Sequence, residues 1–418
     1  MAIQSPSPRT DLNIVLFDAN SYYASCHQAI EPALREKPVL VTGDPKNRTG
    51  IVLTASYEAR LLGVKTTMPI YRALALCPEA ILVRPDFSLY LELSDMMWQI
   101  VGRYTDQEHI EVVSIDECYA DFSGSTRLFG TTISIARRVQ SEIWGELHLG
   151  VSVGLSYCKI MAKIGSEYAR DPITRIKLPR SFTQISPQEV QSMIWPLRVG
   201  EIPGVGHKFE QRLNTLGINS IGDLAQYPAP ALTAHIGSLA PKLNEWANGH
   251  DLRPVRTCSS ESPRSLGRSI TLSEDIADSE QVRQVLLSLA DSVGSKIRKR
   301  NSKTKIITLT VKSSDFKVRT FSTTLSEPTD NTTIIYHECC RLFQTKWSQG
   351  KPIRLLGISV TLLERKFEQL TLFNEHETTA CQLNHTVDTL RQRFGSQIIL
   401  RGTQLLPLSH KVHKRTDK

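Results

Sequence analysis

The spacing of apolar and polar residues changes several times along the chain, and each change predicts a different region. From residue 11 to about 175, short apolar runs alternate with segments of helical spacing, which predicts an α/β or α+β region built on one sheet. The runs expected as strands include 39–41, 81–83 and 151–155, and the helical segments are 55–62, 88–104, 130–147 and 157–169.

From about 176 to 250 the spacing predicts short helices interrupted by glycine and proline, and the polar stretch 251–263 predicts a linker. A β-α-β-β-α-β order follows, which predicts a small sheet with two helices on one face. Its expected elements are strand 266–271, helix 277–299, strands 304–313 and 317–326, helix 330–346 and strand 354–363. Residues 380–405 combine helical spacing with a strand-like run at 397–400, and no function is assigned to them.

Composition indicates a soluble protein with a polyanionic partner. The 418 residues are 40% hydrophobic and 22% charged and carry a formal net charge of +8. No apolar run approaches the roughly 20 residues that span a bilayer, and residues 1–10 are expected to be a disordered leader rather than a secretory signal. The basic tail 409–418 is expected to be disordered too. The eight cysteines form no Cys-x-x-Cys pair, which fits a reducing cytoplasm without a zinc site or a disulfide framework.

Three carboxylates lie at the ends of expected strands. Asp18 ends the apolar run 13–17, and the pair Asp116-Glu117 separates two runs rich in β-branched and aromatic residues, which predicts a hairpin with both carboxylates at its tip. Carboxylates brought together repel one another unless cations neutralise them, and oxygen-only ligands suit Mg²⁺. The set predicts two-metal phosphoryl transfer, although an Asp-Glu pair also suits a solvated turn and Asp18 alone suits a helix cap.

Two further features favour DNA as the polyanion. Residues 202–206 form an apolar-Pro-Gly-x-Gly turn between expected helices, which is typical of a helix-hairpin-helix whose backbone amides hold a DNA phosphate. Lys303, just before the expected strand 304–313, and Lys305, within it, are alternate residues and share one face. That face suits contact with a phosphate backbone, but it also suits an ordinary solvated surface. The residues expected to contact DNA are Pro203, Gly204, Val205, Gly206, Lys303 and Lys305.

Four ordered motifs resemble those of the Y-family translesion DNA polymerases. They are Asp18–Cys26, Thr54–Ile70, Ser114–Glu117 and Val153–Arg170. Together with the helix-hairpin-helix and the last module they cover residues from about 12 to 365, and the likeness is to the bacterial DinB and UmuC branch without deciding between the two.

The resemblance implies an α+β, multidomain chain with the form of a right-hand polymerase. The palm is expected at 11–21 and 85–175, the small fingers at 22–84, the helix-hairpin-helix thumb at 176–250 and the βαββαβ little finger at 264–366. The leader 1–10 precedes them, the linker 251–263 separates thumb from little finger, and a clamp-binding peptide with a tail occupies 367–418.

The resemblance further implies a template-directed, error-prone DNA polymerase without a proofreading exonuclease, acting on primer-template DNA and dNTPs. Asp18 and Asp116 would bridge two Mg²⁺ ions, for which Mn²⁺ can substitute. Glu117 would serve the ion that activates the primer 3′-hydroxyl, and the backbone carbonyl of Ala19 would add an oxygen. Cys118, next to the carboxylate pair, is expected to serve packing rather than catalysis.

The nucleotide would meet residues of three motifs. Tyr57 and Arg60 lie three apart on one expected helix and hence on one face, where they suit phosphate oxygens. Lys163 matches the family's phosphate-binding lysine. Tyr23 matches the steric gate, whose ring leaves no room for a ribose 2′-hydroxyl, and Tyr22 would then pack inward; the alternative is that both tyrosines are simply core aromatics.

A second partner is indicated near the end of the chain. Residues 369–373 resemble the bacterial sliding-clamp-binding pentapeptide, an extended segment that fills an apolar pocket. The protein would work in the bacterial cytoplasm at the nucleoid, and the sequence leaves open whether accessory subunits are needed. The clamp contacts are expected from Gln369, Leu370, Leu372 and Phe373.

Three other functions account for part of the sequence. One is a DNA- and clamp-binding accessory protein with lost or partner-dependent catalysis, which would have no reason to keep three repelling carboxylates. Another is a transferase that inserts one preferred nucleotide. A palm-fold nucleotide cyclase would share the metal chemistry but would not require the helix-hairpin-helix or the clamp peptide.

Overall fold

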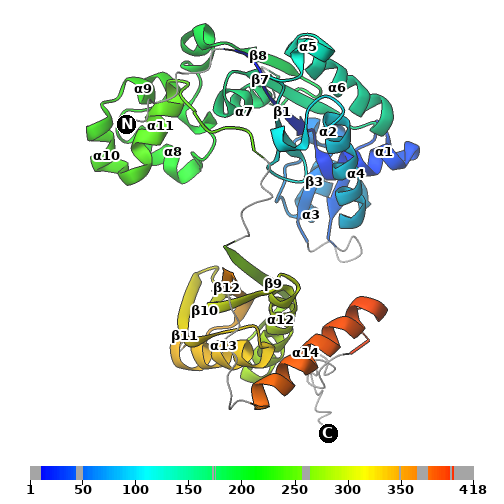
Figure 1. Cartoon of the computed structure of the whole chain (residues 1–418), viewed down its shortest axis with the longest axis vertical. Coiled ribbons are helices and arrows are strands. Elements are labelled where there is room, and N and C mark those ends of the chain that lie inside the picture. The colour runs from blue at the N-terminus through cyan, green and yellow to red at the C-terminus, as the bar shows by residue number, and fades with distance from the viewer. Residues whose placement is uncertain are drawn as a thin grey trace. The chain divides into compact units, whose positions relative to one another are not determined.

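The computed structural model describes residues 11–43, 50–171, 174, 176–256, 264–347, 350–364, 375–395 and 398–399. The chain forms two compact units, Met1–Ser260 and Glu261–Lys418 (Figure 1). Within the described ranges, no helix has the length and apolar character needed to cross a membrane. The expected leader and the basic tail lie outside the described residues.

A five-stranded sheet forms the centre of the first unit. Its strands, in spatial order, are β5 (Ile110–Val112), β6 (Glu117–Asp121), β1 (Ile14–Ala19), β7 (Val151–Ser156) and β8 (Phe182–Ile185), and its helices are α4 (Phe87–Val101), α6 (Thr132–Leu147) and α7 (Lys159–Tyr168). All pairings are antiparallel except that of β7 with β8. Residues 14–17 of the central strand are all buried, because α4 and α6 cover one face and α7 covers the other.

Two glycines let α7 approach the sheet closely. A Cβ on Gly154 of β7 would lie 1.9 Å from the carbonyl oxygen of Ala162 and 2.5 Å from the amide nitrogen of Ser166. A Cβ on Gly165 of α7 would lie 3.4 Å from the Cα of Gly154, so strand and helix meet backbone to backbone. This contact sets the distance of α7 from the sheet and with it the position of Lys163.

A smaller sheet, with its own apolar core, lies between α1 and α4 in the sequence. Its strands are β2 (Val39–Thr42), β3 (Val52–Ala55) and β4 (Ile81–Val83). The helices of this region are α1 (Tyr22–Ile30), α2 (Tyr57–Leu61) and α3 (Ile70–Leu76). The strand order is β3-β2-β4, with β2 antiparallel to β3 and parallel to β4. The expected strands at 39–41 and 81–83 and the helix within 55–62 are confirmed.

The large sheet extends further along the chain than the apolar spacing predicted. Strand β8 pairs with β7 although it lies beyond residue 176, where only short helices were expected. It has no apolar run because it is a four-residue edge strand in which only Thr183 and Ile185 are buried. The expected short helices follow it as α8 (His207–Asn214), α9 (Ile221–Gln226), α10 (Ala229–Ile236) and α11 (Ala240–Ala247), packed around a separate core.

The first half of the predicted linker is fastened to the first unit. Residues 251–256 form neither helix nor strand, but the Asp251 carboxylate accepts a hydrogen bond of 3.1 Å from the amide of Ile160 in α7. The amide of Arg256 donates to Glu111 at 3.2 Å. Val255 is only 4% exposed, so this segment contributes to the core on the α7 face of the sheet.

The second unit has the predicted β-α-β-β-α-β order. It consists of β9 (Ser265–Ile276), α12 (Ser279–Lys299), β10 (Ser302–Ser313), β11 (Val318–Thr329), α13 (Thr332–Lys346) and β12 (Ile353–Glu364). The antiparallel sheet has the order β11-β10-β12-β9, and both helices pack on one face of it (Figure 1). Buried Ile307, Leu309 and Val311 alternate along β10 and face those helices.

A further helix, α14 (Glu375–Phe394), packs against α12 through two reciprocal ion pairs. Arg298 of α12 donates to Asp388 at 2.6 Å, and Arg391 of α14 lies 2.7 Å from Asp291. The helical spacing seen in the sequence is confirmed. The strand expected at 397–400 is wrong for its described residues, because Ile398 and Ile399 lie in a bend without a partner strand.

Candidate active site

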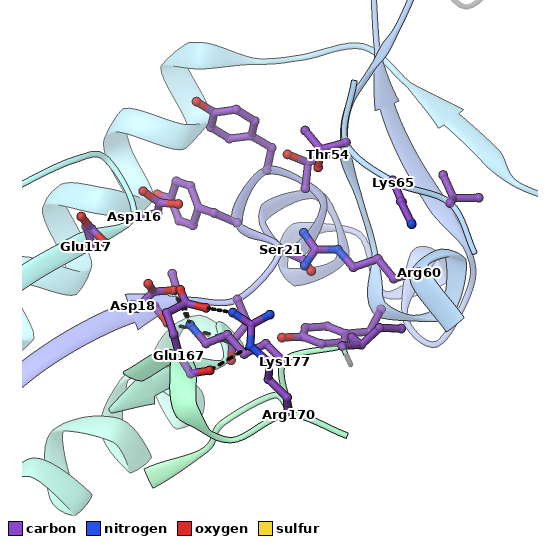
Figure 2. A pocket seen from close by; sticks show the side chains of 18 of the residues that line it. Asp18, Ser21, Thr54, Arg60, Lys65, Asp116, Glu117, Glu167, Arg170 and Lys177 are labelled. Atoms are coloured by element: carbon purple, nitrogen blue, oxygen red, sulfur yellow. Dashed lines mark hydrogen bonds and ion pairs between the residues drawn. The ribbon is translucent and has the colours of Figure 1, made fainter. Parts of the chain in front are cut away.

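The pairing of β1 with β6 brings the three predicted carboxylates to the same cleft. Asp18 lies opposite Glu117, and the amide of Ala19 donates to the carbonyl oxygen of Asp116 at 2.8 Å. The hydroxyl of Ser114, also in the hairpin turn, donates to the Asp116 carboxylate at 2.5 Å. The predicted hairpin is confirmed, and the helix-cap alternative for Asp18 is wrong, since that residue is paired within the sheet (Figure 2).

Two lysines neutralise two of these carboxylates, Asp18 and Glu117. Lys163 of α7 donates to Asp18 at 3.0 Å and to Glu117 at 2.5 Å, and Lys177 donates to the other oxygen of Asp18 at 2.7 Å. Burial raises the pKa of Asp18, but Lys177 and then Lys163 outweigh it, so the net shift is downward and the carboxylate stays charged. Burial also opposes the charge on Lys163, whereas Asp18 and Glu117 hold its pKa above the ordinary value.

The oxygen atoms present suit a divalent cation, although they do not form a closed cage. Among the described residues, no three His, Cys, Asp or Glu side chains come close enough together to hold one ion. Asp18, Asp116 and Glu117 nevertheless line one cleft of about 790 Å³ and offer only oxygen ligands, which hard ions such as Mg²⁺ prefer. An ion bound there would compete with the lysines for Asp18.

The opposite wall of the cleft carries unsatisfied donors. Tyr57 and Arg60 both line it from α2, as their spacing predicted, and Arg60 points into the cleft (Figure 2). The buried hydroxyls of Tyr57 and Ser21 have no hydrogen-bond partner in the described part of the chain. Burial raises the pKa of Tyr57 to about 12, so its hydroxyl remains a donor. Two unpartnered hydroxyls beside a guanidinium form a wall that a polyphosphate would satisfy.

The ring of Tyr23 is held by neighbouring aromatic side chains. It stacks on Tyr90 with 4.3 Å between centroids and meets Phe87 edge-on at 6.0 Å. Tyr22 is only 4% exposed and donates its hydroxyl to the carbonyl oxygen of Tyr90 at 2.6 Å, so it packs inward as predicted. Tyr23 itself lines the cleft, where a rigid ring can limit the space available to a sugar.

Cys118, which follows the carboxylate pair, is fully buried. Burial raises the pKa of its thiol well above the ordinary value, which disfavours the reactive thiolate. Its predicted role in packing is therefore confirmed.

Four charged residues of the cleft were not predicted from the sequence, namely Lys65, Glu167, Arg170 and Lys177. Glu167 of α7 lies 3.5 Å from Lys177 and 3.3 Å from Arg170 (Figure 2). Arg170 also reaches Glu201, near the helix-hairpin-helix, at 3.6 Å. Glu167 and Arg170 follow Lys163 by four and seven residues, a helical spacing that could have indicated them, whereas Lys177 lies in an isolated bridge with Arg170 and has no periodic signal.

The helix-hairpin-helix turn has the conformation that its glycines allow. Gly204 has a φ of 94°, and Gly206 is the residue before α8. The Val205 side chain is 6% exposed and packs in the core, where it anchors the turn. The predicted contact of the turn with DNA, through its backbone, stays a prediction. A Cβ at either glycine would meet nothing within 4 Å, so the space beside the turn is open to a ligand.

The other predicted contact residues lie on the second unit. Lys303 and Lys305 are half-buried on β10 and alternate with buried Ser302 and Thr304, so they share one face of the strand. Their contact with DNA stays a prediction. The clamp-binding residues Gln369, Leu370, Leu372 and Phe373 lie outside the described residues.

Family models match three separate parts of the chain. The impB/mucB/samB family matches residues 17–167, the IMS family HHH motif matches 187–218, and the impB/mucB/samB family C-terminal domain matches 263–372. The matched regions contain the carboxylate cleft, the helix-hairpin-helix turn and the module of the second unit.

Relatives and solved structures agree with these matches. DNA polymerase IV of Pelotomaculum thermopropionicum is 38% identical over 396 residues, which are 94% of this chain and 96% of the relative. DNA polymerase IV 1 of Bacillus subtilis is 37% identical over 392 residues, or 93% and 92% of the two chains.

Among solved structures, a Y-family DNA polymerase chimera, Dbh-Dpo4(243-245)-Dbh, has a TM-score of 0.72 at 26% identity and covers 83% of this chain and 98% of its own. DinB from Sulfolobus solfataricus has a TM-score of 0.53 at 26% identity and covers 84% and 98%. The predicted right-hand polymerase fold is confirmed. The chain belongs to the impB/mucB/samB family, the Y-family DNA polymerases that its four motifs predicted.

Proposed function

We propose that this chain is a template-directed, error-prone DNA polymerase that performs translesion synthesis by two-metal nucleotidyl transfer. The observation that carries the proposal is one cleft with Asp18, Asp116 and Glu117 on one side and Arg60 with the unpartnered Tyr57 hydroxyl on the other. Similar proteins named DNA polymerase IV, and a similar structure described as an insertion ternary complex of Dbh DNA polymerase, support DNA and a nucleotide as the substrates.

The carboxylates and the carbonyl of Ala19 would hold two ions, Mg²⁺ or Mn²⁺. Bound ions of this kind stabilise the attacking and leaving oxygens of an in-line displacement. The chain's own cations do the rest: Lys163 and Arg60 neutralise phosphate charge and fix its orientation through charge-assisted hydrogen bonds. The Tyr57 hydroxyl has no partner to lose among the described residues, so it can donate to a phosphate oxygen once neighbouring side chains move to admit one.

The same proposal gives each region of the chain a part in handling DNA. The five-stranded sheet is the palm, which then includes β8, and the three-stranded sheet belongs to the fingers. The thumb would hold a phosphate at the open turn around Gly204 and Gly206, and the little finger would follow the backbone with Lys303 and Lys305. These residues position the duplex and carry no sequence information.

Primer extension by the purified full chain, with Mg²⁺ and each dNTP singly, tests the proposal. Undamaged and abasic templates are compared, and the incorporated nucleotide is expected to follow the template base opposite undamaged positions. Incorporation of one nucleotide whatever the template would indicate the restricted transferase. Absence of incorporation by a chain that still binds primer-template would favour the accessory protein, unless an added partner restores activity.

Replacing Tyr23 with alanine is expected to admit ribonucleotides, because the ring on the cleft wall would no longer exclude a 2′-hydroxyl. The dNTP-to-rNTP ratio of kcat/KM should fall by about tenfold or more, which corresponds to about 1.4 kcal/mol of transition-state free energy. Tyr23→Phe keeps the ring and its stacking on Tyr90, so it should discriminate as the wild type does. Unchanged discrimination in Tyr23→Ala would remove the gate role.

We further propose that the chain is tethered to the bacterial sliding clamp through Gln369, Leu370, Leu372 and Phe373. Changing Leu372 and Phe373 together to alanine should abolish stimulation of synthesis by added clamp, because two apolar anchors of the pocket would be lost. Extension without the clamp should be unaffected and serves as the control. Stimulation that persists in the double variant would place the tether elsewhere in the chain.

A further inference from the structure

After α7, an isolated antiparallel bridge pairs Arg170 with Lys177. It places a lysine on the central carboxylate of the cleft. The ammonium nitrogen of Lys177 lies 2.7 Å from Oδ1 of Asp18 and 3.5 Å from Glu167, and the side chain is only 11% exposed. Lys177 lies outside all four motifs by which the family was recognised in the sequence, so its place on Asp18 comes from the structure alone.

Lys163 and Lys177 hold different oxygens of Asp18, so both oxygens are engaged. A divalent ion that takes an oxygen of Asp18 would therefore compete with an ammonium that already holds that oxygen. Lys163 would keep a strong second partner, since it lies 2.5 Å from Glu117. Among the described residues, Lys177 would keep only Glu167 at 3.5 Å, which is beyond the usual length of such a hydrogen bond.

A nearly buried ammonium is costly unless an anion lies beside it. The charge of the cleft also requires an anion once divalent ions are bound. Four acids line the cleft, namely Asp18, Asp116, Glu117 and Glu167, against five bases, namely Arg60, Lys65, Lys163, Arg170 and Lys177. The protein alone therefore has one positive charge in excess (five minus four), and two divalent ions would add four more. The triphosphate of a nucleotide supplies the missing negative charge.

We propose that Lys177 is a nucleotide-binding residue that exchanges partners: it holds Asp18 in the ion-free protein and moves to the triphosphate when divalent ions occupy the carboxylates. The inference rests on the proposed polymerase function and adds a phosphate-binding cation to the residues that the family motifs supply. Its distinctive consequence is that removing Lys177 has opposite effects on the two ligands: it strengthens ion binding and weakens nucleotide binding.

The test measures both affinities in the full chain without turnover. Mn²⁺ binding in the absence of DNA and nucleotide is followed by the electron paramagnetic resonance of free Mn²⁺. Lys177→Gln should bind Mn²⁺ about tenfold more tightly, the scale on which a neighbouring charge shifts the affinity of a carboxylate for a proton.

The dNTP affinity of the complex with a 3′-dideoxy primer-template is then measured with Ca²⁺ in place of Mg²⁺. Lys177→Gln should bind the dNTP about tenfold or more weakly, as the loss of one charge-assisted hydrogen bond implies. Lys177→Arg should restore nucleotide affinity.

Lys65→Gln is the matched control, because Lys65 lines the same cleft but contacts no acid among the described residues. Equal effects of Lys65→Gln and Lys177→Gln on both affinities would reduce the result to general electrostatics and overturn the proposal. A wild type that binds dNTP while Lys177→Gln binds it equally well would also overturn it and leave the polymerase function standing. A wild type that binds no dNTP would overturn both. A melting curve checks that Lys177→Gln is folded; Lys177→Met, which keeps the aliphatic stem, replaces it if it is not.

Discussion

Replacing Asp116 with alanine is expected to reduce primer extension by more than about 100-fold. Loss of a residue that only hydrogen-bonds to a metal ligand already lowers activity by up to about 100-fold, and Asp116 is itself a proposed ligand. The hairpin should remain folded. In the described part of the chain, the Asp116 carboxylate hydrogen-bonds only with Ser114, and the bond that ties the turn to Ala19 uses the backbone carbonyl, which alanine retains. DNA affinity should therefore stay nearly unchanged.

Single-turnover extension and primer-template binding, measured on the same preparation, check this prediction. Asp106→Asn is a suitable control because it removes an exposed carboxylate shortly before the same hairpin, where the side chain makes no capping bond. Extension that survives in Asp116→Ala would remove Asp116 from the proposed ion site. Loss of both extension and DNA binding would indicate damage to the fold.

Gly154→Ala is expected to destabilise the first unit by about 3 kcal/mol or more, at or above the upper end of the usual cost of overpacking. The new Cβ would lie 1.9 Å from the Ala162 carbonyl oxygen, which belongs to the backbone of α7 and cannot rotate away. Strand β7 cannot retreat either, because β1 and β8 pair with it on both sides. The helix must move outward, and Lys163 would leave Asp18 with it.

The free energy of unfolding, from urea or thermal denaturation, measures the effect. Gly145→Ala in α6 is the matched control, because its Cβ would meet nothing within 4 Å and alanine favours a helix by roughly 0.5–1 kcal/mol over glycine. The two substitutions add the same methyl group and should change stability in opposite directions. An unfolding midpoint of Gly154→Ala equal to that of the wild type would show that α7 can yield at little cost.

Local patterns in the sequence were enough to predict the carboxylate hairpin and the module of the second unit. A run rich in β-branched residues before Asp116 and Glu117 and a run with aromatic residues after them favour a hairpin, and the order of the six elements of 264–364 was predicted. The family motifs added the partner strand of Asp18 and the nucleotide wall. Apart from what the motifs imply, none of these inferences required knowing which distant residues contact one another.

Features that depend on contacts between distant parts of the chain were not predicted. Strand β8 has too few apolar residues to be recognised, and it exists because the exposed edge of β7 offers it hydrogen bonds. Lys177 is 159 residues from Asp18, and no local period relates the two. Ile398 and Ile399 are apolar enough for a strand, but a strand also needs a neighbour, which the sequence of a segment does not reveal.

The unpartnered hydroxyls of Tyr57 and Ser21 set stability against activity in this protein. A buried polar group without a hydrogen bond costs about 1–3 kcal/mol, and Ser21 also has a φ of 48°, in the left-handed region that few residues other than glycine adopt. The free enzyme therefore carries this cost in the cleft, and a bound phosphate would relieve the part due to the hydroxyls. Laboratory selection for thermal stability alone would favour substitutions of Tyr57 and Ser21, and the most stable variants are expected to bind a nucleotide most weakly.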